Sequence, residues 1–190
     1  MENIIKQCIQ ESIDVKRLVL IDEELIRTIK FIVHKCINSF NSDKKILLCG
    51  NGGSAADAQH IAAELSGRFY KDRKALFAEA LHVNSSFMTA VANDYGFDQT
   101  YARMVEAAGQ KGDILIGIST SGNSDNVINA LIKAKKSEMI TIGLTGKDGG
   151  KMKEFCDFII NIPSKDVSRI QESHILVGHI ICQLIEDKLF

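Results

Sequence analysis

Five short apolar runs, separated by polar stretches with helical periodicity, constrain the fold of this chain most strongly. The runs cover residues 46–49, 76–81, 114–118, 140–144 and 158–162. They lack the strict apolar–polar alternation of a half-exposed strand, so each predicts a strand that is covered on both faces. Buried strands that alternate with helices form a parallel sheet between two layers of helices. The sequence therefore predicts an α/β three-layer sandwich with a five-stranded parallel sheet.

A helical pair is predicted ahead of the first strand. Apolar residues recur at helical spacing over residues 3–20 and 22–40, and Asp22 is placed to cap the second helix. A helical pair outside an α/β core often packs on a partner subunit, and we expect this of residues 1–42. The last segment, 169–190, is predicted to be a long amphipathic helix, and the whole chain, 1–190, to be one domain.

The composition excludes several classes of protein. The formal net charge is −1 and no basic block occurs, which argues against a nucleic-acid surface. No apolar run approaches the ~20 residues that a membrane helix needs. The five cysteines are scattered, without a CxxC motif, and are typical of reduced core residues. The N-terminus does not resemble a signal peptide, so we expect a soluble cytoplasmic protein.

A glycine-rich turn, Gly-Asn-Gly-Gly-Ser at 50–54, follows the first predicted strand and leads into a helix. Its backbone N–H groups and the helix N-terminus suit an anionic ligand, and Ser54 is the expected N-cap. His60 and Glu64 share one face of that helix, as a metal-binding or acid–base pair or as a solvated surface. The turn also satisfies the dinucleotide pattern GxGxxG/A, with Glu79 where a ribose-binding acid would lie.

A second loop, after the third predicted strand, is rich in hydroxyl groups. It precedes the predicted helix 125–136 and contains Ser119, Thr120, Ser121 and Ser124 around one glycine. Hydroxyl donors and free N–H groups at a helix N-terminus suit a phosphate monoester. An ordinary Ser/Thr turn that caps a helix is the other interpretation. The sequence has no GxxxxGK[ST] motif, so P-loop nucleotide hydrolysis is not expected.

Three further sets of polar residues do not by themselves indicate a functional site. His179 lies among apolar residues, which by itself is typical of a core histidine, and we expect His174 to be structural. Asn93 and Asp94 follow the apolar stretch 87–92 and fit a helix C-terminal turn.

The motifs, taken together and in order, resemble those of the phosphoheptose isomerases, which are sugar-isomerase (SIS) domain enzymes. They are 50–54, His60 with Glu64, Asn93-Asp94, 119–124, Thr-Gly-Lys-Asp-Gly-Gly at 145–150 and Arg-Ile-Gln-Glu-Ser-His at 169–174. The resemblance covers nearly the whole chain and implies a flavodoxin-like SIS fold. It implies isomerisation of D-sedoheptulose 7-phosphate to D-glycero-D-manno-heptose 7-phosphate, the first step toward activated heptose for surface glycans. It also implies a homotetramer with active sites at subunit interfaces.

The resemblance implies site residues as well. One Zn²⁺ per subunit would be held by His60, Glu64, Gln171 and His179. The sugar phosphate would contact Asn51, Gly52, Gly53, Glu64, Asn93, Asp94, Ser119, Thr120, Ser121, Ser124 and Gln171. We assign the carbon proton to Glu64 and the oxygen proton to His179. Gln171 and His179 are separated by ~12 Å along a helix and ~80° around it. Both reach one metal only if Gln171 lies at a frayed helix start or one ligand comes from another subunit.

Two rival functions stay open. A non-catalytic SIS relative that senses a sugar phosphate would keep the loops and could lose the catalytic histidine. The presence of His60, Glu64 and His179 together favours an enzyme. A dinucleotide-binding oxidoreductase would use the glycine-rich turn but leaves the hydroxyl-rich loop unexplained.

Overall fold

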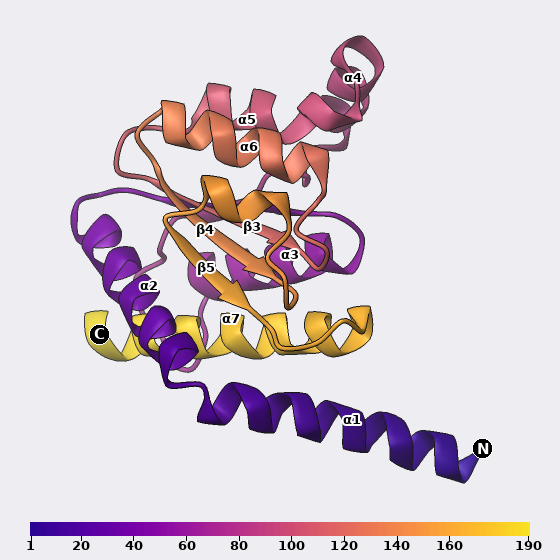
Figure 1. The fold of residues 1–190 in the computed structure, drawn as a ribbon. Coiled ribbons are helices and arrows are strands. Elements are labelled where there is room, and N and C mark those ends of the chain that lie inside the picture. The colour runs from indigo at the N-terminus through magenta and orange to yellow at the C-terminus, as the bar shows by residue number, and fades with distance from the viewer.

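A computed structural model describes all 190 residues, and its centre is a parallel sheet between two layers of helices (Figure 1). The strands are β1 (Ile46–Gly50), β2 (Ala78–Ala80), β3 (Ile114–Ser119), β4 (Ile140–Thr145) and β5 (Phe158–Asn161). Their order in the sheet is β2-β1-β3-β4-β5, and every pairing is parallel. The predicted five-stranded parallel sheet is confirmed. Chain order reverses between β1 and β3, the point at which such sheets bind ligands.

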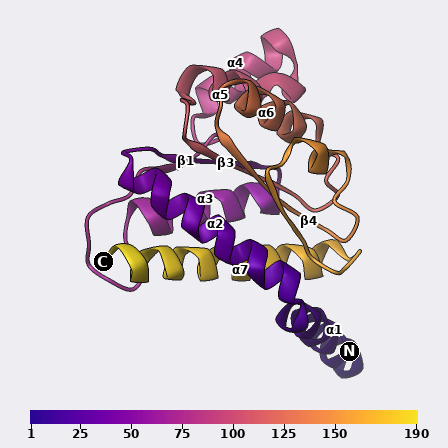
Figure 2. The ribbon, with the colours of Figure 1, turned by 60° about the vertical axis from the view of Figure 1, so that its left-hand side comes forward.

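The helices cover both faces of the sheet, as predicted (Figures 1 and 2). One layer contains α2 (Glu23–Asn41), α3 (Gly53–Ser66) and α7 (Val167–Leu189). The other contains α4 (Ser85–Tyr95), α5 (Thr100–Ala108) and α6 (Asp125–Lys136). Two short 3₁₀ turns, η1 (Phe97–Gln99) and η2 (Lys151–Phe155), complete the connections.

Two apolar cores, one on each face of the sheet, explain why the strands lack polar alternation. Leu48 and Ile116 pack toward α2, α3 and α7, whereas their neighbours Leu47 and Leu115 pack toward α5 and α6. Successive side chains of a strand point to opposite faces, so a strand covered on both sides must be apolar throughout. Every residue of β1 and β3 is buried.

The first helix, α1 (Glu2–Ile21), extends away from the rest of the molecule (Figures 1 and 2). Arg169 at the start of α7 holds it by donating to the carbonyl oxygen of Cys8 at 2.8 Å. Asp22 caps α2 as predicted, because its side chain accepts from the N–H of Leu25 at 2.9 Å. None of the helices combines the length and the apolar character that crossing a membrane requires.

The buried histidine of α7, His174, is predicted to make the fold sensitive to acid. Its Nε2 lies 3.2 Å from the carbonyl oxygen of Thr145, and burial lowers its pKa to about 4, despite this hydrogen bond. An unfolded histidine titrates near ~6.5. As the pH falls from 6.5 toward 4, the unfolded chain therefore binds a proton that the folded chain does not, and stability falls.

The expected contribution of His174 to this acid sensitivity is roughly 2–3 kcal/mol between pH 7 and pH 4.5. Urea unfolding of the wild type and of His174→Gln at both pH values measures it, because glutamine offers an N–H donor but no group that titrates. The variant should lose less stability on acidification. Equal losses would show that His174 does not control this transition.

Candidate active site

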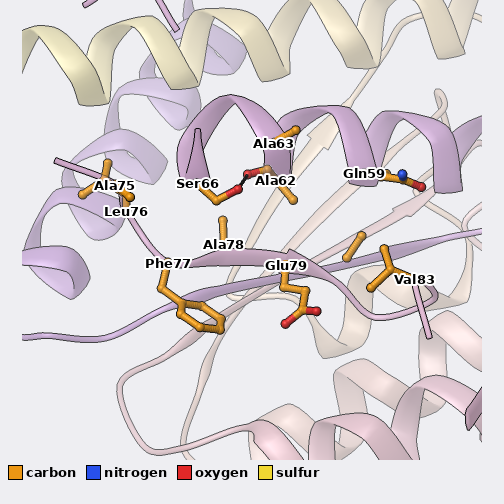
Figure 3. A pocket seen from close by; sticks show the side chains of 11 residues that line it. Gln59, Ala62, Ala63, Ser66, Ala75, Leu76, Phe77, Ala78, Glu79 and Val83 are labelled. Atoms are coloured by element: carbon orange, nitrogen blue, oxygen red, sulfur yellow. Dashed lines mark hydrogen bonds between the residues drawn. The ribbon is translucent and has the colours of Figure 1, made fainter. Parts of the chain in front are cut away.

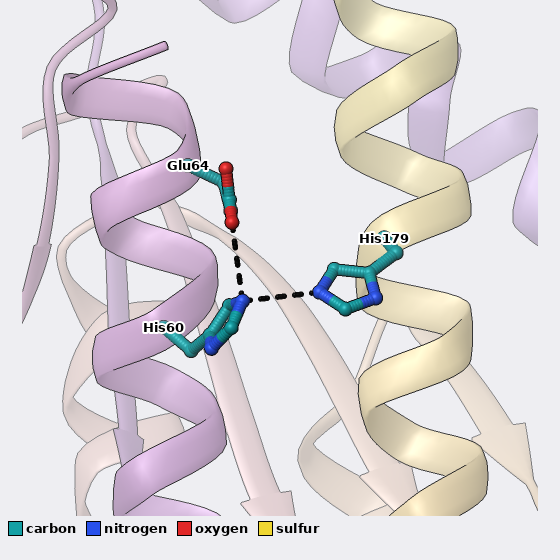
Figure 4. A group of neighbouring side chains, drawn as sticks. All are labelled: His60, Glu64 and His179. Atoms are coloured by element: carbon teal, nitrogen blue, oxygen red, sulfur yellow. Dashed lines mark hydrogen bonds and ion pairs between the residues drawn. The ribbon is translucent and has the colours of Figure 1, made fainter. Parts of the chain in front are cut away.

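Three of the predicted site residues meet between α3 and α7 (Figure 4). His60 Nε2 lies 3.1 Å from Glu64 Oε1, one helical turn along α3. The same nitrogen lies 3.1 Å from Nε2 of His179 on α7. One possible ligand atom from each residue lies within 4.8 Å of the others. The structure thus brings together residues that are more than 110 positions apart in the sequence.

A close approach of the two helices produces this cluster. A Cβ built on Gly178 would lie 2.5 Å from Cδ1 of Ile61, so α7 can pack this tightly only because residue 178 is glycine. The next residue, His179, is thereby placed beside His60. A glycine inside a long helix costs stability relative to alanine, and here the close packing explains its presence.

The donor atoms of the cluster fit a zinc ion. Two imidazole nitrogens and one carboxylate are a common donor set of catalytic zinc sites. The Nε2 atoms of His60 and His179 face each other at 3.1 Å, so only one of the two can carry a hydrogen that points at the other. A cation could take the place of that hydrogen and be bound by both nitrogens. The cluster opens to an adjoining cavity of about 510 Å³ whose walls include Phe69, Tyr70 and Leu176.

A buried ion pair that sequence reasoning missed holds the loop that lines part of this cavity. Glu186 on α7 accepts from the backbone N–H groups of residues 69–71 at 3.2, 2.8 and 2.7 Å, and from Arg73 Nε at 2.9 Å. Both charged side chains are 2% exposed. Burial raises the pKa of Glu186, but the N–H donors and Arg73 outweigh it and hold this pKa below its usual range.

The Arg73–Glu186 pair fixes the loop after α3 relative to both helices. Arg73 also donates to the carbonyl oxygens of Glu64 and Leu65 at 2.8 and 2.9 Å. The loop places the ring of Phe69 5.8 Å from that of His179, measured between ring centroids. The ion pair thereby supports two members of the cluster, Glu64 and His179.

The hydroxyl-rich loop lies at the carboxyl end of β3. Ser119 Oγ is 2.9 Å from Ser124 Oγ and 3.5 Å from Ser121 Oγ. Ser124 is the N-cap residue of α6, yet its side chain makes no capping hydrogen bond. The interpretation as a turn whose serine caps the helix is therefore wrong for this side chain. The hydroxyls of Ser121 and Ser124 both lie near that of Ser119, beside the N-terminus of α6.

The Thr-Gly-Lys-Asp-Gly-Gly motif at 145–150 supports that loop through its backbone. The N–H of Gly146 donates to the carbonyl oxygen of Thr120 at 3.1 Å. Gly122 (φ +66°) and Gly150 (φ +56°) pack so closely that a Cβ on either would overlap the backbone of the other segment. Both glycines are therefore required by conformation and by space.

The glycine-rich turn begins α3 differently from the prediction. Gly52, with φ 57°, is the N-cap residue, and the helix starts at Gly53. Ser54 lies inside the first turn and is buried, so its expected role as the N-cap is wrong. The reason is the positive φ at residue 52, which glycine adopts without strain and which ends the loop two residues earlier.

Gln171 lies beside the glycine-rich turn. A Cβ built on Gly53 would lie 2.5 Å from the amide atoms of Gln171. Gly53 precedes His60 by seven residues, which is ~10 Å along a helix. Because α7 is continuous from Val167, Gln171 does not occupy a frayed helix start.

The Asn93–Asp94 pair lies apart from the cluster. Both residues are exposed in the last turn of α4, where the Asn93 amide donates to the Asp94 carboxylate at 2.8 Å. Helix α4 and the α3–α7 cluster are on opposite faces of the sheet (Figure 1). Within one chain, the predicted site residues thus form separate groups.

A second cavity lies between α3 and the edge strand β2 (Figure 3). Its volume is about 520 Å³, and alanines, Leu76, Phe77 and Val83 form most of its wall. Glu79 is its only carboxylate, and it points away from α3. The cavity offers no acid–base pair comparable to Glu64 with His179.

Comparisons with known proteins agree with this geometry. Residues 15–146 match the SIS domain family. The phosphoheptose isomerase of Aneurinibacillus thermoaerophilus is 53% identical over 190 residues, which cover 100% of this chain and 96% of that protein. The structure of the phosphoheptose isomerase from Neisseria gonorrhoeae has a TM-score of 0.92 at 42% identity and 98% coverage of both chains. That of the enzyme from Francisella tularensis has a TM-score of 0.94 at 34% identity and 97% coverage of both. The chain belongs to the phosphoheptose isomerase family of SIS-domain enzymes.

Proposed function

We propose that the protein is an aldose–ketose isomerase that converts D-sedoheptulose 7-phosphate to D-glycero-D-manno-heptose 7-phosphate. This reaction would begin the synthesis of activated heptose for surface glycans. The proposal rests on one observation: His60, Glu64 and His179 lie together in a chain that is 53% identical to a phosphoheptose isomerase. We place the enzyme in the cytoplasm, and its five free cysteines are consistent with a reducing compartment.

The reaction moves one proton between carbons and one between oxygens, with no net change in redox state. Glu64 removes the C1 proton of the ketose, which gives an enediol(ate), and delivers a proton to C2. His179 transfers the proton between the oxygens on C1 and C2. Glu64 is accessible for this task, since its side chain is 24% exposed.

The hydroxyl-rich loop is the proposed phosphate site. Ser119, Thr120, Ser121 and Ser124 would donate to the phosphate oxygens together with free N–H groups of α6. The mutual approach of the Ser119 and Ser124 hydroxyls, 2.9 Å apart, supports a common ligand. Asn51, Gly52, Gly53 and Gln171 would contact the sugar from the glycine-rich turn and α7.

We further propose a homotetramer in which a neighbouring copy completes each site. Asn93 and Asp94 lie on the face of the sheet opposite the cluster, so a second copy would have to bring this pair to the sugar. Residues 1–42 would form part of the subunit contacts, since Ile4, Ile5 and Ile9 of α1 are exposed. A cavity of about 530 Å³ lies between α1, α2 and α7, and its wall is mostly apolar.

One Zn²⁺ per subunit belongs to the proposal, with His60, Glu64 and His179 as ligands. When bound, the ion would polarise the two sugar oxygens. Gln171 stays a predicted fourth ligand; in this chain its amide packs against Gly53, and it would have to reach the ion from another subunit.

Removal of zinc is expected to lower turnover by at least about 100-fold, because two ligand histidines and the base are organised by one ion. The measurement compares chelated enzyme with enzyme to which one equivalent of zinc is restored, with metal content determined by mass spectrometry. His60→Ala should bind less than stoichiometric zinc, whereas His34→Ala, at an exposed position of α2, should bind one ion. Full activity of the metal-free enzyme would show that catalysis does not need the ion.

Binding and turnover measured together test the proposed function against its rivals. Sedoheptulose 7-phosphate should raise the melting temperature and be consumed, whereas NADH should do neither. Binding without consumption would indicate a sugar-phosphate sensor. Stabilisation by NADH alone would indicate a dinucleotide-binding protein.

A further inference from the structure

A pair of amide side chains joins the two predicted ligand loops where the strand order reverses. Asn51 follows β1, and Asn126 lies in the first turn of α6, just after the hydroxyl-rich loop. Each amide donates to the oxygen of the other, and both N···O distances are 2.9 Å. Asn126 is 3% exposed, and its Oδ1 also accepts from the N–H of Val127 at 3.0 Å. The pair thus spans the neighbouring ends of β1 and β3, where open α/β sheets bind ligands.

We propose that Asn126 is a positioning residue for the phosphate site and that Asn51 acts through it; this inference rests on the proposed function. The Asn51 side-chain amide pairs with Asn126 of α6, so it holds the two loops in register in addition to the sugar contact proposed for this residue. Each partner must supply one donor and one acceptor, which an amide does. An aspartate at 126 would lose the donor and face the oxygen of Asn51 with a carboxylate.

Neighbouring contacts fix the same region from the α5–α6 side of the sheet. The buried hydroxyl of Tyr101 on α5 donates to the carbonyl oxygen of Gly50 at 2.5 Å. Helix α3 leaves the glycine-rich turn on the other side and carries His60 to the cluster. The amide pair therefore sets the position of the phosphate loop relative to the helix that bears half of the reaction centre. Its loss should disturb phosphate binding more than the cluster.

A double-mutant cycle with inorganic phosphate as the probe tests this inference on the full-length protein. Asn51→Ala and Asn126→Ala should each weaken phosphate binding about tenfold, because either change leaves the partner amide, which is half-buried at Asn51 and buried at Asn126, without its hydrogen bonds. The double variant should lose no more than either single one, since both remove the same interaction. In Asn126→Ala the KM for the sugar phosphate should rise in parallel, with kcat within about twofold of the wild type.

Asn129→Ala is the matched control. Asn129 lies one turn along α6, and its amide donates to the carbonyl oxygen of Asp98 at 3.0 Å, outside the loop contact. This variant should bind phosphate normally. If Asn126→Ala fails to fold, Asn126→Ser, which removes the amide without adding a charge, replaces it in the cycle.

Three outcomes would overturn the inference. They are unchanged phosphate affinity in Asn51→Ala, additive losses of about 100-fold in the double variant, and no phosphate binding by the wild type. Turnover of sedoheptulose 7-phosphate by the wild type, measured on the same preparation, tests the proposed function separately. If the wild type turns over the sugar phosphate but the effects of Asn51→Ala and Asn126→Ala add, only the inference is contradicted. If the two effects do not add but the wild type has no turnover, only the proposed function is contradicted.

Discussion

Replacement of Glu64 by glutamine is expected to abolish isomerisation and to leave the fold intact. Glutamine has nearly the same shape but cannot accept the C1 proton, and loss of a positioned general base typically costs about 10²–10⁴ in rate. The Glu64 side chain is partly exposed, and its one side-chain partner is His60, at 3.1 Å, so little packing energy is at stake. Steady-state kcat and thermal unfolding, measured on the same preparation, test both parts of this prediction.

Glu24→Gln, at an exposed position of α2, is the control and should behave as the wild type. Zinc content must be measured on Glu64→Gln as well, because the same carboxylate is a proposed ligand. A variant that keeps zinc and loses turnover supports the base role. Substantial turnover by Glu64→Gln would require another residue as the base.

Removal of the buried carboxylate of Glu186 should have the largest effect on stability. Truncation of one partner of a buried ion pair typically costs about 3–5 kcal/mol. Here three backbone N–H groups and Arg73 lose their acceptor together. We expect Glu186→Ala to lower the free energy of unfolding by this amount and the melting temperature by roughly 6–20 °C. Urea unfolding followed by circular dichroism measures the first quantity.

The next residue provides the matched control. Asp187 forms an exposed ion pair with Lys71 at 3.3 Å, and Asp187→Ala should cost no more than about 1 kcal/mol. An apolar replacement of both partners, Arg73→Met with Glu186→Leu, should not restore stability, because the N–H groups of residues 69–71 would still lack an acceptor. A loss below about 1 kcal/mol in Glu186→Ala would mean that the loop is held by other contacts.

Acid should weaken the same ion pair. The pKa of Glu186 is below its usual range in the folded protein, so its contribution is complete above the pKa of an unfolded glutamate, ~4.3. The contribution is then lost as the pH falls through the lower folded value.

The sequence predicts the architecture well because the architecture rests on local patterns. Continuous apolar runs such as 46–49 and 114–118 mark strands that are covered on both faces, and each became a strand. The helix cap at Asp22 was also predictable, since a cap involves residues only three positions apart. The pairing of His60 with Glu64 follows in the same way from helical spacing.

The remaining parts of the site depend on contacts between distant residues. Arg73 and Glu186 are 113 positions apart, and no local pattern marks either of them. Asn126 lies in an ordinary-looking helix start, and its partner Asn51 is 75 positions away. Helix α3 starts at Gly53 because Gly52 adopts a positive φ. The sequence pattern favoured Ser54 as the N-cap instead, since serine is a common N-cap residue. Resemblance to a family supplied His179 and Gln171, which spacing alone did not single out.

Proton NMR of the purified protein with sedoheptulose 7-phosphate tests the central claim most directly. We expect the anomeric signals of an aldose heptose 7-phosphate to grow as the ketose signals decline, and not to grow with Glu64→Gln. A ketose spectrum that stays unchanged with a protein that binds the sugar phosphate would show that the protein is not an isomerase of this sugar.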